Sequence, residues 1–252
     1  MTRNLQPALA LFAIGMMELG ALGMAKAGFA LEWLPLAPWI PLRLALAYVA
    51  CALMLVCGAG LFAGRTRMWS VRILLPWLVV WQLLRLPDII RHPGIEGVWE
   101  SFAEVAVLLA AGLVLLVRFG GGRLAEERGV RLAQLWFGLW LIPIGLSHFF
   151  YAAITYGMVP AWMPWRGVWG PVVGVAHIAA GVAVLCGARI GVLSRVAAFV
   201  WAAMIGLFTL LIWIPAAAAH PGVLQNWSEL STSWAMAAGA LVVAQGWSSE
   251  SD

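Results

Sequence analysis

Long apolar runs fill most of the chain, and short stretches with charges, proline or glycine separate them. A helix that crosses a bilayer needs about 20 mainly apolar residues. Eight runs of that kind occur, at 8–27, 44–64, 72–90, 98–118, 131–155, 168–188, 192–214 and 229–246. The pattern therefore predicts an all-α membrane protein with eight transmembrane helices.

The composition agrees with a lipid-embedded chain. Of the 252 residues, 63% are hydrophobic and 10% are charged, whereas a soluble domain carries about 25% charged residues. The chain has 16 Trp against three Tyr, and Trp is enriched at membrane–water interfaces. The net charge of +4 comes from basic residues in the short loops, so the expected partner is the lipid bilayer and not nucleic acid.

Two halves of the chain repeat the same motifs. Trp-x-Pro begins at Trp39 and again at Trp162, and Arg72 matches Arg195 at the same spacing. The pattern Pro-x4-His-Pro-Gly-x4-Trp occurs at 87–99 and at 215–227. Such repeats are common in membrane proteins built by duplication. We expect two tandem four-helix bundles, at 1–118 and 131–252, joined by a cytoplasmic linker at 119–130.

The distribution of Lys and Arg predicts the orientation of the helices. Ten basic residues lie on one side: Arg3, Arg65, Arg67, Arg72, Arg118, Arg123, Arg128, Arg131, Arg189 and Arg195. Five lie on the other: Lys26, Arg43, Arg85, Arg91 and Arg166. Because excess Lys and Arg marks the cytoplasmic side, both termini are predicted to be cytoplasmic, in a multi-pass protein of a bacterial inner membrane.

Motifs in the second half resemble the DoxX-like family of small four-helix membrane proteins. These motifs are Gly145-Leu146-Ser147-His148-Phe149, then Val159-Pro160-Ala161-Trp162-Met163-Pro164, then Gly174-Val175-Ala176-His177-Ile178-Ala179-Ala180-Gly181. The first half shares Trp39-Ile40-Pro41 and Gly58-Ala59-Gly60, so the resemblance covers nearly the whole chain as two repeats. The first half lacks Gly-Leu-x-His-Phe, and with a one-residue slip Lys26 falls at the position of His148.

The resemblance implies a limited set of functions. Some DoxX-like proteins are the membrane subunit of a thiosulfate:quinone oxidoreductase, and others are linked to membrane complexes that handle oxidative stress. Most have no assigned activity. The resemblance therefore implies a membrane subunit that binds quinone or lipid for a redox complex.

Ionisable residues inside the predicted spans are the candidate site, since such residues are costly in a membrane and usually functional. The candidates are Glu18, Glu100, Glu104, His148 and His177. Counting from the span ends places Glu104 and His148 at similar depth in the outer part of the membrane, and Glu18 and His177 nearer the middle. We expect a polar, outward-opening cavity that binds a ligand, and Arg85 could pair there with Asp88 or with the carboxylates.

Each candidate also has a structural interpretation. Glu96 and Glu100 begin a predicted helix, where the helix dipole favours negative charge. His148 and His177 could hydrogen-bond between helices. Two His without further ligand spacing are a weak metal signal, so neither a metal site nor haem is expected.

A quinone is the cofactor that fits such a cavity, because its carbonyls need donors and its reduction needs protons. No catalytic signature and no soluble domain is evident, so the chain is not expected to be a stand-alone enzyme, and the redox cofactor would lie on a partner protein. A small transporter or permease, or a membrane assembly factor without chemistry, are the alternatives.

Overall fold

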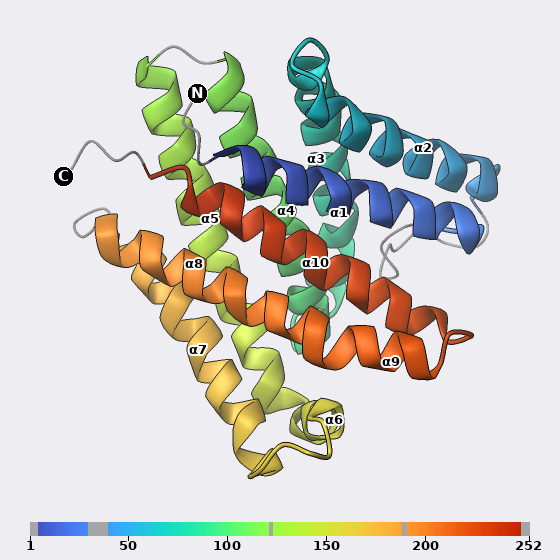
Figure 1. Ribbon diagram of the computed structural model, residues 1–252, viewed down its shortest axis with the longest axis vertical. Coiled ribbons are helices and arrows are strands. Elements are labelled where there is room, and N and C mark those ends of the chain that lie inside the picture. Colours follow the sequence, from blue (N-terminus) through green and yellow to red (C-terminus); the bar gives the residue numbers. More distant parts are fainter. Residues whose placement is uncertain (1–4, 30–39, 121–122, 188–190, 248–252) are drawn as a thin grey trace.

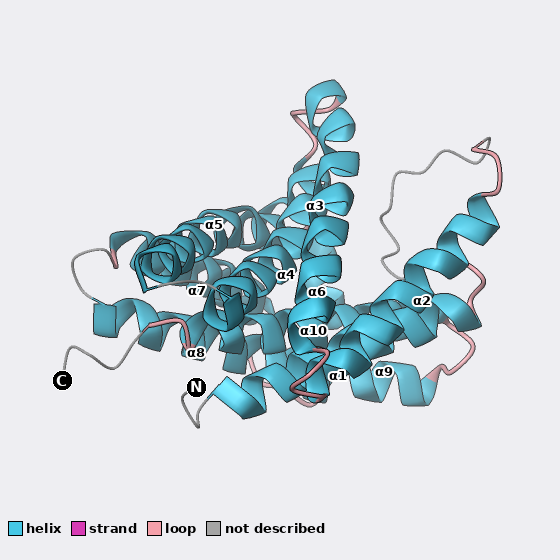
Figure 2. Ribbon diagram, turned by 90° about the horizontal axis from the view of Figure 1, so that it is seen from above, coloured by secondary structure: helices cyan, strands magenta, loops and turns pink. Residues whose placement is uncertain are grey.

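The computed structural model describes residues 5–29, 40–120, 123–187 and 191–247, and the regular elements in this part of the chain are all helical (Figure 2). The first half holds α1 (Leu5–Ala25), α2 (Arg43–Phe62), α3 (Arg67–Arg91) and α4 (Glu96–Gly120). The second half holds α5 (Arg123–Phe150), the short α6 (Ala152–Met158), α7 (Arg166–Cys186), α8 (Gly191–Phe208), the π-helix η1 (Thr209–Trp213), α9 (Ile214–Ala219) and α10 (Leu224–Ala244).

Seven helices in the described chain are long and apolar enough to cross a membrane, with α8, η1 and α9 forming one span, Gly191–Ala219. They match the first seven predicted spans, so the class of a multi-pass helical membrane protein is confirmed. The eighth predicted span corresponds to α10, which has 21 residues but is less apolar. Its first half carries Gln225, Asn226, Ser228, Glu229 and Ser231. The eighth crossing stays a prediction.

The sequence of α10 is explained by its central place. Twelve of its 21 residues are buried, so other helices, and not lipid, solvate most of it. It packs against α8, α1 and α4, and a Cβ on Gly15 of α1 would lie 2.8 Å from the Cα of Ala235 in α10. Small residues allow such close helix contacts in membranes.

The two halves are interlocked instead of forming two self-contained bundles. Within each half, consecutive long helices pack together, α1–α2–α3–α4 and α5–α7–α8–α10. The last helix of each half then packs along the first helix of the other, α4 on α5 and α10 on α1 (Figure 1). Among the described residues α1 has no extended contact with α4. α4 and α10 therefore each contact helices of both halves, and the division into two tandem four-helix bundles stays a prediction.

The helix ends fall into two groups at opposite ends of the molecule. The start of α1, the end of α10, the start of α8, the end of α4 and the start of α5 lie toward the upper left in Figure 1, whereas α6 and the turn before α10 lie toward the lower right. This grouping agrees with the predicted order of crossings. Which end is cytoplasmic stays a prediction.

Candidate functional site

A very close contact between α5 and α7 brings two histidines together. A Cβ atom on Gly145 would lie 2.7 Å from the carbonyl oxygen of Gly174, and a Cβ on Gly174 would lie 2.9 Å from that of Gly145. Only glycine permits this backbone approach. One turn farther along each helix, the rings of His148 and His177 stack with centroids 5.2 Å apart and planes 27° apart.

His177 is held from its other side by Trp201 of α8. The indole Nε1–H of Trp201 donates a hydrogen bond of 2.7 Å to His177 Nδ1. Both side chains are fully buried, and Phe137 packs edge-on against Trp201 at 5.4 Å. His177 Nε2 and His148 Nδ1 are also buried, and neither has a hydrogen-bond partner.

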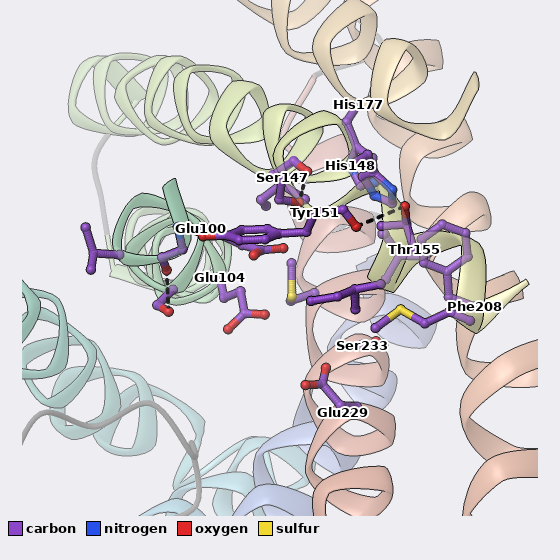
Figure 3. A pocket seen from close by; sticks show the side chains of 18 of the residues that line it. Glu100, Glu104, Ser147, His148, Tyr151, Thr155, His177, Phe208, Glu229 and Ser233 are labelled. Atoms are coloured by element: carbon purple, nitrogen blue, oxygen red, sulfur yellow. Dashed lines mark hydrogen bonds between the residues drawn. The ribbon is translucent and has the colours of Figure 1, made fainter. Parts of the chain in front are cut away.

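These histidines line a cavity of about 760 Å³, within the range of about 300–1,000 Å³ that is usual for small-ligand sites. The cavity lies where the two halves meet, between α3, α4, α5, α6, α7, the α8–η1 segment and α10. Figure 3 shows the histidine pair on one side, with Glu100 and Glu104 from α4 and Glu229 from α10 facing the same space. Apolar walls complete it, from Ile95, Val98, Ile144, Ile154, Met158, Ile205, Phe208, Trp213 and Met236.

Carboxyl groups outnumber cations in this cavity. Glu104 lies close enough to Glu100, Glu229 and Arg85 to interact with the charge of each. Arg85 also interacts with Asp88, as the sequence suggested. Arg85 is only 6% exposed, and its Nε has no hydrogen-bond partner. Among the described lining residues Arg85 is the one permanent cation, so it balances one of the four carboxylates.

Hydroxyl groups in the cavity wall make hydrogen bonds within the protein, and one of them keeps a proton that it can donate to a ligand. Ser147 Oγ donates to the Ile144 carbonyl at 2.8 Å, and Ser101 Oγ donates to the Gly97 carbonyl at 2.8 Å. Tyr151 Oη accepts a hydrogen bond from the Gly97 backbone N–H at 3.0 Å. Since its oxygen serves as the acceptor there, the hydroxyl proton of Tyr151 remains available, and Tyr151 lines the cavity.

An irregular turn shapes the wall next to the histidines. The π-helix η1 separates α8 from α9, just before Pro215, which cannot donate a backbone hydrogen bond. Single π turns in helices occur often at functional sites. Phe208, just before η1, and Trp213, its last residue, both line the cavity, and the Phe208 ring lies 6.4 Å from that of His177.

Four of the five predicted site residues come together here, namely Glu100, Glu104, His148 and His177. Glu18 does not line this cavity. It shares a face of α1 with Leu11 and Gly15, which contact Trp234 and Ala235 of α10. One of its carboxylate oxygens is buried without a hydrogen-bond partner.

Glu96 begins α4, as predicted, but it is buried and neither carboxylate oxygen has a hydrogen-bond partner. Sequence reasoning missed three contributors, Glu229, Tyr151 and Trp201. Glu229 fell at the edge of a predicted span, and nothing in the sequence distinguished Tyr151 and Trp201 from the other aromatic residues. The polar residues at the start of the last predicted span were the one feature of the sequence that could have pointed to Glu229 as a site residue.

The histidine pair occurs in the second half alone among the described residues. Gly20 approaches the Cys51 carbonyl in the α1–α2 contact as Gly145 approaches Gly174 in the α5–α7 contact. Counting one turn from these contacts, Gly23 occupies the position of His148 and Met54 that of His177. Lys26 is therefore not the counterpart of His148 in this packing.

No family model, no curated protein and no solved structure matches the chain significantly. The resemblance to the DoxX-like family thus stays a prediction from the quoted motifs. What the fold and the site define together is a multi-pass helical membrane protein with a polar, acid-rich cavity between its two halves.

Proposed function

We propose that this protein is a quinone-binding membrane subunit of a redox complex, of the DoxX-like type, in a bacterial inner membrane. The observation that carries the proposal is the fully buried His177, which lines the cavity and has a ring nitrogen without a partner. A buried polar atom of this kind is unfavourable unless something bonds to it. A ligand in the cavity provides that bond.

The chemistry of the walls suits a quinone. A quinone ring is flat and apolar, and its two carbonyl oxygens accept hydrogen bonds. Ile144, Ile154 and Phe208 offer apolar surface, and His177 and Tyr151 offer donors. Reduction of a quinone takes up two protons, and Glu100 and Glu104 are carboxyl groups placed in the same cavity to exchange them.

The electrons would come from another protein. The described chain consists almost entirely of helices that pack against one another, and it has no domain outside them that could carry a large redox cofactor. In this proposal the partner supplies that cofactor, and this chain holds the quinone, supplies the protons and excludes lipid.

Equilibrium binding of decylubiquinone to the purified protein in lipid nanodiscs tests the proposal. We expect the Glu104→Gln and His177→Gln variants to bind about tenfold more weakly, since the first removes the carboxyl group that exchanges protons with the ligand and the second removes the ring N–H that donates to it. Glu18→Gln is the matched control, because Glu18 is an intramembrane carboxylate outside the cavity. Absence of binding, or an equal effect of Glu104→Gln and Glu18→Gln, would refute the proposal.

A transporter is the second candidate, and two observations favour it. The cavity lies between two halves whose helices interlock, and one span beside it is interrupted by η1 and Pro215. Transporter sites often lie at repeat interfaces next to discontinuous helices. Uptake of labelled tetraphenylphosphonium into proteoliposomes under a pH gradient, and its loss in Glu104→Gln, would support transport of cations over quinone binding.

A further inference from the structure

The hydrogen bond between Trp201 and His177 determines where the proton of the imidazole lies. An indole N–H can donate a hydrogen bond but cannot accept one. The nitrogen that receives it, His177 Nδ1 at 2.7 Å, must therefore present a lone pair. A neutral histidine with a free lone pair on Nδ1 carries its proton on Nε2.

His177 Nε2–H is consequently a donor that has no acceptor within the described protein. The nitrogen is buried and without a partner, and His177 lines the cavity. Trp201 cannot easily turn away, because it is fully buried and packs edge-on against Phe137. Tyr151 presents its own free hydroxyl proton to the same cavity, since its oxygen is occupied by the Gly97 N–H.

We propose that Trp201 is a positioning residue that keeps His177 in its Nε2–H form, so that this end of the cavity binds the oxygen of a neutral carbonyl group. The inference rests on the proposed function in that it assumes a ligand in this cavity, and it names the chemical class of that ligand. The N–H donor of His177 and the acidic residues of the cavity together disfavour metal ions and anions at this end.

Cations and metal ions are disfavoured at the histidines. A metal ion binds the lone pair of a histidine nitrogen, but Nε2 of His177 carries the proton and the lone pair of Nδ1 accepts the Trp201 hydrogen bond. Haem ligation by His148 and His177 would require that proton to move to Nδ1 and the Trp201 hydrogen bond to break. A carboxylate or phosphate ligand is disfavoured for a different reason. It would lie among Asp88, Glu100, Glu104 and Glu229 with Arg85 as the one opposing charge.

The position of the proton can be measured without any ligand. In protein labelled with ¹⁵N-histidine and reconstituted in nanodiscs, we expect the His177 signal of the Nε2–H tautomer. The Trp201→Phe variant keeps an aromatic ring against Phe137 but removes the donor, and we expect a mixture of both tautomers. Trp136→Phe is the matched control, because the Trp136 indole N–H has no hydrogen-bond partner and its loss should leave His177 unchanged.

The ligand class is tested with two probes that share one alkyl tail. We expect 2-dodecanone, a neutral ketone, to shift the His177 Nε2 signal and to bind about tenfold more weakly to Trp201→Phe. Dodecyltrimethylammonium should leave that signal unshifted. A wild-type His177 that carries its proton on Nδ1, or that responds equally to both probes, overturns the inference, and the wild-type measurement decides the matter even if Trp201→Phe fails to fold.

The two proposals fail in different ways. If His177 is in the Nε2–H form and responds to the ketone but decylubiquinone does not bind, the quinone function is wrong and the carbonyl site stands. If decylubiquinone binds while His177 carries its proton on Nδ1, the quinone function stands and the role of Trp201 is wrong.

Discussion

Replacing Gly174 by alanine should separate α5 from α7 and with them the two histidines. The added Cβ would lie 2.7 Å from Cε2 of the Phe149 ring and 2.9 Å from the Gly145 carbonyl oxygen, whereas ordinary contacts of a Cβ begin at 3.4 Å. Rotation of the Phe149 side chain could relieve the first contact. The second contact is with backbone, so the helices must move apart by about 0.5 Å at this point.

The expected change in the free energy of unfolding follows from two opposing effects. Overpacking of this kind costs about 1–3 kcal/mol, and alanine is favoured over glycine in a helix by up to about 1 kcal/mol. Gly206→Ala isolates the second effect, since a Cβ on Gly206, within α8, meets nothing within 4 Å. We expect Gly174→Ala to be less stable than Gly206→Ala by about 1–3 kcal/mol.

Thermal unfolding of both variants in nanodiscs measures the difference. A gap of about 2 kcal/mol corresponds to a Tm lower by roughly 5 °C for a chain of this size. Ligand affinity should fall in Gly174→Ala and stay unchanged in Gly206→Ala, because only the former moves His148 relative to His177. Equal Tm values for the two variants would refute the close helix contact from which the site is derived.

Three further predictions concern the rest of the fold. Gln82 donates from Nε2 to the Phe102 carbonyl at 2.9 Å, while its own side-chain oxygen is buried without a partner. Gln82→Met removes both the hydrogen bond and the unpaired oxygen, so it should change the free energy of unfolding by less than about 1 kcal/mol in the same assay. A large loss of stability would mean that the oxygen has a partner. In a Cys186→Ser background, Gly94→Cys and Gly222→Cys, both in open space, should react with a membrane-impermeant maleimide on intact cells, whereas Gly64→Cys should react only after permeabilisation. The reverse labelling pattern would mean that the orientation is inverted. If Gly222→Cys is labelled from outside, a C-terminal tag inside the cell would show that α10 crosses the membrane. Arg118 binds Glu126 and the Gly246 carbonyl, so Arg118→Gln should lower the free energy of unfolding by about 1 kcal/mol. The loss should be smaller at high salt, because the ion pair is partly exposed. A loss independent of salt would mean that the hydrogen bond to the Gly246 carbonyl accounts for the stabilisation.

The positions of the helices were predictable because lipid imposes a simple rule on sequence. A segment that faces hydrocarbon must be apolar over its full length, and seven spans follow that rule. α10 departs from it because protein surrounds most of it. The sequence does not say which helix will be shielded, since that depends on contacts between segments far apart in the chain.

The site was predictable in part, for a related reason. Glu104, His148 and His177 stood out because ionisable groups are costly in a membrane, and that cost is visible in a sequence. Glu18 stood out equally, yet it faces the α1–α10 contact, because the cost alone does not say which helices meet. Trp201 could not be distinguished from the other Trp residues, since its role depends on one hydrogen bond across two helices.

The interlocking of α4 and α10 has a consequence during synthesis. α1 leaves the ribosome well before α10, which is one of its main neighbours. Until α10 is made, the face of α1 that will contact Trp234 and Ala235 of α10 has no native neighbour in the bilayer. Glu18 lies on that face. We therefore expect chains truncated before residue 224 to be degraded rapidly by membrane proteases, and the two halves produced as separate polypeptides to be stable only when they are made in the same cell.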